Sequence, residues 1–352
     1  MHSFTFNSKT PTRAHIALVL ILCAVFCASV ELVTSHFFGR VSRIEKRRET
    51  EYRAAVAVRS AKTQHKTSVV VAGNSLLLHG IDFPQLQQDV GGEIELHRTV
   101  FENTYFLDWY YGFQKMFRAG ARPDVMVLVL SPAQLTSDMN DSDYGVHMLV
   151  DPHDIIRFAK DMHTDRNRMS VLVLDNFSFF FGARAEIRTW ILGKILPDLP
   201  LLTSSFGRYY KFAPPDKNTV LEVSAKRLQQ LRNLCGQYGT EFVLVVPPTL
   251  QDSGTSEVLE AGASQGVPVL IPLRPGVLSS ENYSDEVHLN SQGAGEFTLA
   301  LASNLKKVMA QNAIQTETAS VLPEHPANRP LHKTAIDVVQ PNAPTTAALI
   351  SK

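Results

Sequence analysis

Cysteine is scarce in this chain, with three residues among 352. Cys23 and Cys27 lie in an apolar stretch near the N-terminus, so only Cys235 belongs to the rest of the chain. One thiol cannot build a disulfide framework, and it cannot supply the set of thiolates that a cysteine-based zinc site needs. The sequence therefore argues against a disulfide-stapled domain and against a zinc-thiolate site.

An excess of charge of one sign is also absent, because Lys plus Arg and Asp plus Glu both number 34. Proteins that bind nucleic acid usually present a basic face, so we expect no nucleic-acid partner. Hydrophobic residues make up 44% of the chain and charged residues 19%, which fits a globular core rather than a disordered chain. The length is sufficient for one large domain with appendages.

One long hydrophobic run is present near the N-terminus. Residues 16–30 are almost continuously apolar, and apolar residues continue past Glu31 to Phe38. The whole run reaches the ~20 residues that span a bilayer. We therefore expect a single-pass membrane anchor over residues 15–38, preceded by a cytoplasmic tail over residues 1–14. A cleaved signal peptide and a buried core helix are the alternatives.

The charges on the two sides of this run leave its orientation open. Lys9 and Arg13 precede the run, whereas a denser basic cluster that begins at Arg40 follows it. The positive-inside rule, read literally, would leave the body of the protein in the cytoplasm. Residues 39–66 are charged, with interspersed alanines and valines, and we interpret them as a helical stalk that leads to the main domain.

Short apolar runs alternate with helical patterns over residues 67–310. Apolar runs without alternation indicate a parallel sheet covered by helices on both faces, so we predict an α/β fold. The expected strands are residues 67–72, 94–100, 124–130, 241–246 and 267–271, and the expected helices are residues 76–89 (broken near Gly80), 106–119, 220–238, 256–265 and 291–310.

Two segments depart from this alternation. Residues 138–215 are rich in His, Asp, Phe and Arg, and we interpret them as a helical insertion that forms a lid, or else as ordinary packing helices. Residues 311–352 are rich in Pro, Ala and Thr without periodicity, which predicts a disordered tail.

A serine follows the first expected strand. Ser75 sits in Val-Val-Val-Ala-Gly-Asn-Ser-Leu (residues 69–76), where a buried strand ends in a turn of small residues. Such a turn exposes the hydroxyl, and the helix that follows offers backbone N–H groups to a developing oxyanion. A serine hydroxyl is a weak nucleophile unless a base removes its proton. The alternative is that Ser75 only caps this helix.

An aspartate and a histidine lie three positions apart near the other end of the domain. Asp285 and His288 occur in Ser-Asp-Glu-Val-His-Leu-Asn (residues 284–290), and on one turn both can face the same cleft. Asp285 would then fix the tautomer of the imidazole. A helix cap by Asp285 beside a surface histidine is the alternative. Together with Ser75, the pair supplies a nucleophile, a base and an orienting carboxylate, which predicts hydrolysis or transfer of an ester-linked group.

These motifs resemble those of the SGNH/GDSL hydrolase superfamily. Residues 73–76 are similar to its Gly-Asp-Ser-Leu block, with Asn74 in place of Asp, and residues 285–290 are similar to its terminal Asp-x-x-His block. The resemblance covers roughly residues 67–135 and 218–308. It implies a flavodoxin-like three-layer α/β/α sandwich that needs no cofactor, with Ser75 as nucleophile, His288 as base and Asp285 as orienting residue. An α/β-hydrolase is disfavoured, because its serine sits in a Gly-x-Ser-x-Gly elbow.

Two blocks of the family pattern are not matched. The glycine donor expected after the second strand is replaced by Glu102-Asn103-Thr104-Tyr105, and the Gly-x-Asn-Asp block after the third strand reads Ser-Pro-Ala-Gln (residues 131–134). We expect the oxyanion hole to use the backbone N–H of Ser75, with Asn103 or Gln134 as substitute donors. Losing one donor can cost ~100- to 1,000-fold in rate. The second hypothesis is therefore a non-catalytic protein of this fold that binds a polysaccharide or a partner in envelope assembly.

The anchor, the Ser-Pro-x-x-Leu after the third strand and the terminal block are similar to a divergent, membrane-anchored branch of DltD-like and AlgJ/AlgX-like proteins. Proteins of this branch handle acyl groups on cell-envelope polymers. The resemblance implies an acylated polysaccharide as substrate and a domain outside the cytoplasmic membrane. This location is opposite to the one that the positive-inside rule gives from the basic residues after the hydrophobic run.

Other histidines carry weaker signals. His147, His153 and His163 lie among aspartates in the insertion, but their spacing matches no metal-binding motif, and we expect a solvated polar face rather than a metal site. His79 lies one helical turn after Ser75, where it either lines the cleft or packs against its neighbours.

Overall fold

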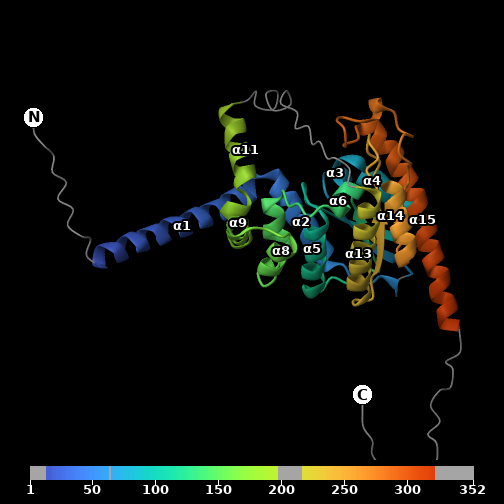
Figure 1. Ribbon diagram of the computed structural model, residues 1–352, viewed down its shortest axis with the longest axis horizontal. Helices are drawn as coiled ribbons and strands as arrows, with labels where there is room; N and C mark the ends of the chain where they lie inside the picture. Colours follow the sequence, from blue (N-terminus) through green and yellow to red (C-terminus); the bar gives the residue numbers. More distant parts are fainter. Residues whose placement is uncertain (1–12, 63–64, 197–215, 322–352) are drawn as a thin grey trace, which may run out of the picture. The chain divides into compact units, whose positions relative to one another are not determined.

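The computed structural model describes residues 13–62, 65–196 and 216–321, with side chains described up to residue 310 (Figure 1). Its centre is a parallel five-stranded sheet of order β2-β1-β3-β4-β5, which confirms the predicted α/β class. The strands are β1 (Thr67–Gly73), β2 (Ile94–Val100), β3 (Val125–Val129), β4 (Glu241–Val245) and β5 (Val269–Leu270).

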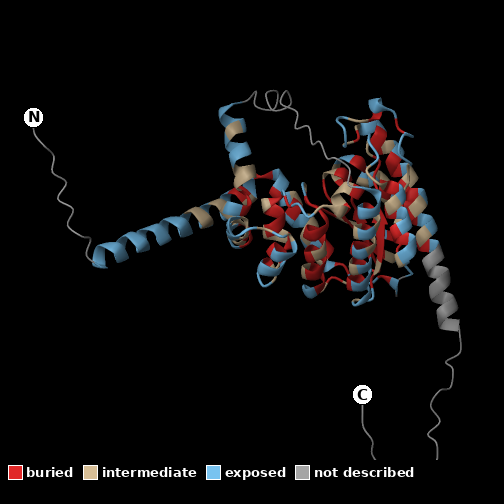
Figure 2. Ribbon diagram, viewed as in Figure 1, coloured by how far each residue is buried: buried red, intermediate tan, exposed pale blue. Residues whose placement is uncertain are grey.

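Helices pack on both faces of the sheet and bury two apolar clusters, consistent with three layers (Figure 2). Alternation along β1 divides its side chains between the faces, because Val69 and Val71 belong to one cluster whereas Val70 and Ala72 belong to the other. The first face packs against α3 (Ser75–Gly80), α4 (Phe83–Val90) and α15 (Ser291–Val321), and the second against α5 (Phe106–Arg118), α13 (Lys217–Gly236) and α14 (Thr255–Gln265).

The break predicted near Gly80 separates α3 from α4. Asp82 caps α4 by accepting a hydrogen bond from the amide of Gln85, and Pro84 lies in the first turn, where its missing N–H costs nothing. At the other end of the chain, α15 continues past the predicted end at residue 310 to Val321. The sequence contains no proline in this extension before Pro323. The rest of the predicted tail, residues 322–352, lies outside the described residues.

The insertion follows the short helix α6 (Pro132–Thr136) and is helical where it is described. Its first helices are fixed to α5, since the ring of Phe158 lies edge-on to that of Tyr111 at 5.3 Å and Gly112 lies against Leu149. The helices of the insertion are α7 (Asp143–Leu149), α8 (Ile155–Asp161), α9 (Arg166–Phe177), α10 (Phe179–Gly182) and α11 (Arg184–Ile195). The predicted lid residues 197–215 lie outside the described residues.

The N-terminal hydrophobic run forms α1 (Arg13–Val41), which is long and apolar enough to cross a membrane. It is not a core helix, because the side chains of its apolar window are exposed in the structure (Figure 2). The expected stalk forms α2 (Arg43–Ala57), which begins at the N-cap Ser42 and lies against β2. This segment is therefore part of the domain surface and covers the edge strand of the sheet.

Candidate active site

Ser75 is the first residue of α3, and only Asn74 separates it from the end of β1 at Gly73. The cap of this helix is Asn74, whose Oδ1 accepts a hydrogen bond from the amide of Leu76 at 3.0 Å. The buried Asn74 side chain also donates from Nδ2 to the carbonyl oxygen of Thr104 at 2.8 Å. Because Asn74 does the capping, the hydroxyl of Ser75 remains available for other partners.

Gly73 allows the turn that presents Ser75. A Cβ atom on Gly73 would lie 2.9 Å from the carbonyl oxygen of Val129 and 3.0 Å from Cβ of Leu77. Both neighbours belong to the packed interior, so a larger residue would have to displace β3 or α3. A glycine at position 73, two residues before the serine, is thus a steric requirement of the strand-to-helix junction.

Asp285 and His288 lie on a closed turn between the 3₁₀ helix η2 (Ser280–Asn282) and α15. The backbone of Ser284 donates to the carbonyl oxygen of His288 at 2.9 Å, which closes the turn. Oδ1 of Asp285 accepts hydrogen bonds from the amides of Val287 at 2.8 Å and His288 at 2.7 Å. Asn290, rather than Asp285, accepts from the first amides of α15. Asp285 therefore organises its own turn and is free to orient the imidazole.

The three predicted residues meet at the carboxyl end of β1. Nε2 of His288 lies 2.9 Å from Oγ of Ser75, and Nδ1 of His288 lies 2.7 Å from Oδ2 of Asp285. Both distances are within the hydrogen-bonding range of a nucleophile, a base and a carboxylate that orients the base. The side chain of His288 is one-quarter exposed, at 25%, so the triad can be reached from solvent.

The charges around the triad favour a carboxylate at Asp285. Burial alone would raise the pKa of Asp285, but hydrogen bonds from the ring and backbone of His288 and from Val287 together lower it. His79 places its ring edge-on to that of His288, with the ring centroids 5.4 Å apart. Burial and the neighbouring His288 lower the pKa of His79, which therefore favours its neutral form. His79 lines the site next to the ring of His288.

Two backbone amides are candidates for an oxyanion hole. Ser75 is the first residue of α3, and an amide at this position has no acceptor within its helix. Asn103 has a φ of 57°, a left-handed conformation that asparagine tolerates better than most residues other than glycine. Within the described part of the chain, the Asn103 amide donates no hydrogen bond. Asn103 thus holds its amide in a left-handed conformation that glycine also adopts.

Gln134, the other expected donor, has a structural role in α6. Its Oε1 accepts a hydrogen bond from the amide of Ser131 at 3.1 Å, and the amide of Gln134 donates to Oγ of Ser131 at 3.3 Å. This reciprocal pair is a capping box at the start of α6. The side-chain oxygen of Gln134 is therefore engaged in holding the helix start that follows β3.

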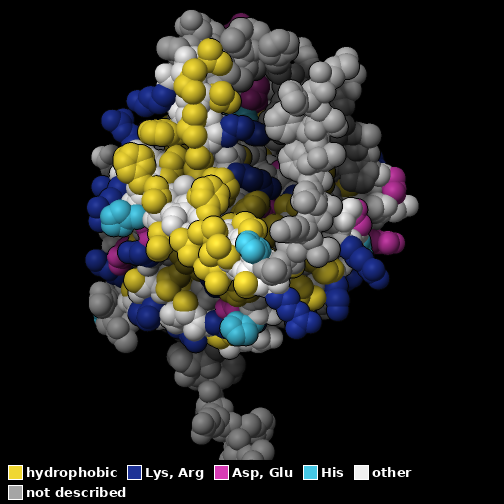
Figure 3. Space-filling view, turned by 90° about the vertical axis from the view of Figure 1, so that its left-hand side faces the viewer, with side chains coloured by type: hydrophobic (Ala, Val, Ile, Leu, Met, Phe, Trp, Pro, Cys, Tyr) yellow, Lys and Arg dark blue, Asp and Glu magenta, His cyan; other side chains and the backbone are white. Residues whose placement is uncertain are grey.

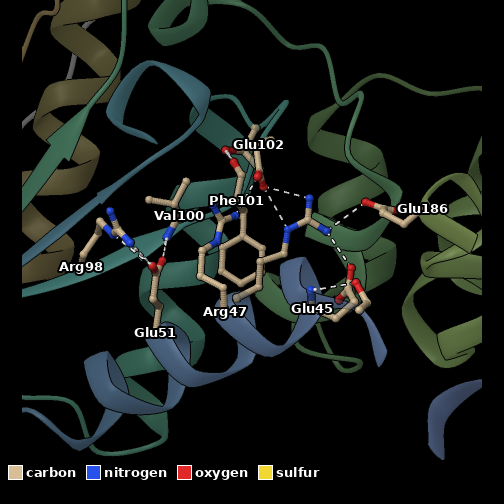
Figure 4. Close-up of polar contacts among 11 residues, drawn as sticks. Glu45, Arg47, Glu51, Arg98, Val100, Phe101, Glu102 and Glu186 are labelled. Atoms are coloured by element: carbon tan, nitrogen blue, oxygen red, sulfur yellow. Dashed lines mark hydrogen bonds and ion pairs between the residues drawn. The ribbon is translucent and has the colours of Figure 1, made fainter. Parts of the chain in front are cut away.

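The loop that carries Asn103 is attached to α2 by ion pairs (Figure 4). Glu102 pairs with Arg47 at 2.7 Å and with Arg48 at 2.8 Å. Arg48 also pairs with Glu45 at 3.0 Å and with Glu186 of α11 at 2.9 Å. This network could not be expected from the sequence, because charged residues that follow a hydrophobic run are equally typical of a solvated helical stalk.

A second set of contacts joins α2 to β2, the strand that precedes the Asn103 loop. Glu51 accepts hydrogen bonds from Arg98 at 2.6 Å and from the amide of Val100 at 3.2 Å (Figure 4). The amide of Phe101, the next residue, donates to the carbonyl oxygen of Gly73 at 3.1 Å. The end of β2 is thus fixed between α2 on one side and the serine-bearing turn on the other.

The histidines of the insertion make other contacts. Nδ1 of His147 lies 3.0 Å from the carbonyl oxygen of Asn176, and His153 pairs with Asp151. Within residues 13–62, 65–196 and 216–310, no group of three or more His, Cys, Asp or Glu side chains is arranged to hold a metal ion.

The sequence was also compared with known proteins. No protein-family model matches it, and no curated protein matches it.

Proposed function

We propose that this chain is a membrane-anchored serine esterase or O-acyltransferase of the SGNH/GDSL type. The observation that carries the proposal is the hydrogen-bonded series Ser75–His288–Asp285 at the carboxyl end of a parallel sheet. Ligand and catalytic sites of open α/β sheets form at this end. The resemblance of the sequence blocks around these residues supports the same assignment.

The geometry supports a two-step reaction. Nε2 of His288 accepts the Ser75 proton while Oγ attacks the carbonyl carbon of an ester, and Asp285 stabilises the imidazolium that forms. The amides of Ser75 and Asn103 donate to the oxyanion of the tetrahedral intermediate. His288 then returns the proton to the leaving alcohol as the ester bond breaks, which leaves an acyl group on Ser75. Water or a sugar hydroxyl, deprotonated by His288, attacks this acyl group, and His288 returns the proton to Oγ of Ser75 as the bond between the acyl group and the serine breaks.

An acylated polysaccharide of the cell envelope is the substrate class that we propose. The side chain of Asp285 is 53% exposed, so the triad lies at the surface rather than at the bottom of an enclosed chamber. A polymer could reach a surface site without having its whole length enclosed. The similarity to the membrane-anchored branch that acts on envelope polymers supports this class and a domain outside the cytoplasmic membrane.

The second candidate is a non-catalytic domain that binds a polysaccharide or an envelope-assembly partner. Residues 131–134 read Ser-Pro-Ala-Gln where the family pattern has Gly-x-Asn-Asp, so the usual asparagine donor is missing after β3, and the cap of α6 fixes the Gln134 side chain through its oxygen, which favours this candidate. The intact triad geometry opposes it.

The deciding experiment is labelling of the full-length protein, in detergent or membranes, with a fluorophosphonate probe. The probe reacts with activated serines. Labelling of the wild type that is lost in both Ser75→Ala and His288→Ala would support the enzyme. Ser256→Ala, at an exposed serine on α14, serves as a matched control and should label like the wild type.

Absence of labelling in a folded wild type, or equal labelling of Ser75→Ala, would overturn the catalytic proposal. Circular dichroism of each variant separates a lost nucleophile from a lost fold. If the folded wild type is not labelled, a polysaccharide-binding assay on the wild type tests the second candidate, because binding without an activated serine is what the non-catalytic protein requires.

A further inference from the structure

Large apolar side chains are exposed on α9, α10 and α11. They are Phe177, Phe181, Trp190, Ile191 and Ile195, with exposed fractions from 37% to 68%, and we call them the α9–α11 surface. Figure 3 shows hydrophobic side chains gathered over one face of the molecule, with Lys and Arg side chains beside them. Contiguous exposed apolar surface of this kind marks a site of interaction.

The α9–α11 surface is attached to the hydrophobic helix α1. The carboxylate of Glu31 accepts hydrogen bonds from Oγ of Ser178 and from the amide of Phe179, each at 2.6 Å. Farther along α1, the ring of Trp190 lies edge-on to those of Phe37 at 6.4 Å and Phe38 at 6.3 Å. The exposed apolar side chains of the insertion are therefore continuous with α1.

The position of Glu31 sets the level of this attachment. The charged residues Arg13 and Glu31 bound the apolar part of α1 and lie ~27 Å apart along the helix at ~1.5 Å per residue. This length is close to the ~30 Å of a bilayer's hydrocarbon core. A carboxylate is costly within that core. The membrane span would therefore end near Glu31, where α10 meets α1.

The composition of α11 matches the boundary between lipid and water. None of its residues is buried, so the helix lies on the surface of the domain. It carries Trp190 and the basic residues Arg188 and Lys194, and its acidic Glu186 is paired with Arg48. Tryptophan is enriched at membrane interfaces, where long basic side chains extend towards the head groups.

We propose that the α9–α11 surface lies in the interfacial layer of the lipid bilayer that α1 crosses. The inference rests on the proposed anchoring of α1 in a membrane. The domain is then held against the membrane at two places instead of being suspended on a single helix. The triad would consequently work at a fixed height above the lipid.

Trp190 offers a direct test, because the chain has two tryptophans and Trp109 is fully buried. The full-length protein is reconstituted in phosphatidylcholine–phosphatidylglycerol vesicles whose acyl chains carry bromine at shallow or deep positions. We expect quenching of tryptophan emission that is strongest with shallow bromines. In Trp190→Phe, the quenchable emission should be almost completely lost.

A pair of charge variants provides the matched control. Ile195→Glu should weaken quenching by the shallow bromines, because it places a charge in the proposed lipid contact. Leu299→Glu introduces the same charge at another exposed apolar position, on α15, and should leave quenching unchanged.

The outcomes separate this inference from the proposals on which it rests. Vesicle flotation reports the anchor, and a protein that does not float overturns the anchor and this inference together. A protein that floats while Trp190 is quenched by aqueous iodide, and not by brominated lipid, overturns this inference alone. Shielding from both quenchers also overturns it and indicates that protein, rather than lipid, covers this surface. Fluorophosphonate labelling in the same vesicles reports the catalytic proposal independently.

Discussion

Ser75 and His288 are separated by 213 positions in the chain, and their Oγ and Nε2 atoms lie 2.9 Å apart. No local secondary structure can place these two residues next to each other. The serine is set by the end of β1, and the histidine by the turn before α15, so their distance depends on how α15 packs against the sheet. Substitutions at the site should therefore separate into those that alter the chemistry and those that alter this packing.

Asp285→Asn should lower the labelling rate ~100- to 10,000-fold while the protein stays folded. The asparagine oxygen can still accept from the amides of Val287 and His288, but its NH₂ group would face Nδ1 of His288. That arrangement favours the tautomer that carries its proton on Nε2, which cannot accept the serine proton. The labelling rate constant is the measurement, with Glu286→Gln as control. A rate for Asp285→Asn equal to that of the control would exclude an orienting role for Asp285.

Asn74→Asp should destabilise the protein by ~1–3 kcal/mol, although it introduces the residue found in the Gly-Asp-Ser-Leu block that residues 73–76 resemble. A carboxylate can still accept from the amide of Leu76 but cannot donate to the carbonyl oxygen of Thr104. The buried carbonyl then loses its partner and faces a negative charge. Urea denaturation measures the change. Unchanged stability would show that the bond to Thr104 does not matter.

Glu102→Gln should slow labelling by ~10-fold, less than the ~100-fold that a 1 Å displacement can cost. The change weakens the ion pairs to Arg47 and Arg48 that attach the Asn103 loop to α2. Glu49→Gln, which breaks an exposed pair with Arg53 on the same helix, is the control and should label at the wild-type rate. Rates are measured where each variant is fully folded, so equal rates would reject Glu102 as a positioning residue.

Two glycine substitutions should have opposite effects on stability. Gly73→Ala would place Cβ 2.9 Å from the carbonyl oxygen of Val129, which should cost ~1–3 kcal/mol and reduce labelling. Gly295→Ala in α15 meets no atom within 4 Å and should stabilise the protein by up to ~1 kcal/mol. Thermal unfolding of both variants provides the comparison. A neutral Gly73→Ala would contradict the tight junction described above.

Asp108 should make the folded state less stable as the pH rises from about 4 to about 7. Burial raises its pKa to about 7, even though it accepts hydrogen bonds from the amide of Tyr105 and from Asn140. The folded state therefore keeps a proton that the unfolded state releases near pH ~4, and stability falls with pH between these values. Urea denaturation at pH 5 and pH 7 measures the slope.

Asp108→Asn removes this titration. The free energy of unfolding of the variant should therefore fall less between pH 5 and pH 7 than that of the wild type, even if the substitution changes the stability at both pH values. Glu45 and Asp175, whose pKa values burial raises to about 7 and about 6, act in the same direction and remain in the variant. An unchanged slope would mean that Asp108 does not hold its proton in the folded state.

The sheet could be predicted because its strands are short apolar runs between turn residues. The expected strand at residues 94–100 matches β2, and the break near Gly80 follows from Gly80 and Pro84. The triad residues were identifiable from residue type and spacing, since an Asp and a His three apart can share a turn. Their contact with Ser75 depends on the tertiary fold, so it could not be predicted from the spacing of residues alone.

The role of α2 could not be predicted from the sequence. Its glutamates and arginines resemble a solvated helix, and only the fold reveals that Glu51 meets Arg98 and that Arg48 meets Glu102. The conformation of Asn103 was also hidden, because asparagine occupies both ordinary and left-handed backbone conformations. The ion pairs of α2 depend on residues that lie far away in the chain, and the conformation of Asn103 is a property of the backbone that its residue type does not determine.

The separation of the triad along the chain has a consequence for biosynthesis. Ser75 leaves the ribosome more than two hundred residues before His288, and the turn that carries His288 is held by Asn290 and by the start of α15. A nascent or truncated chain that ends before this turn has the serine without its base. Ser75 and His288 therefore come together only when α15 has packed against the finished sheet, so under the proposed function the serine has no base until that step.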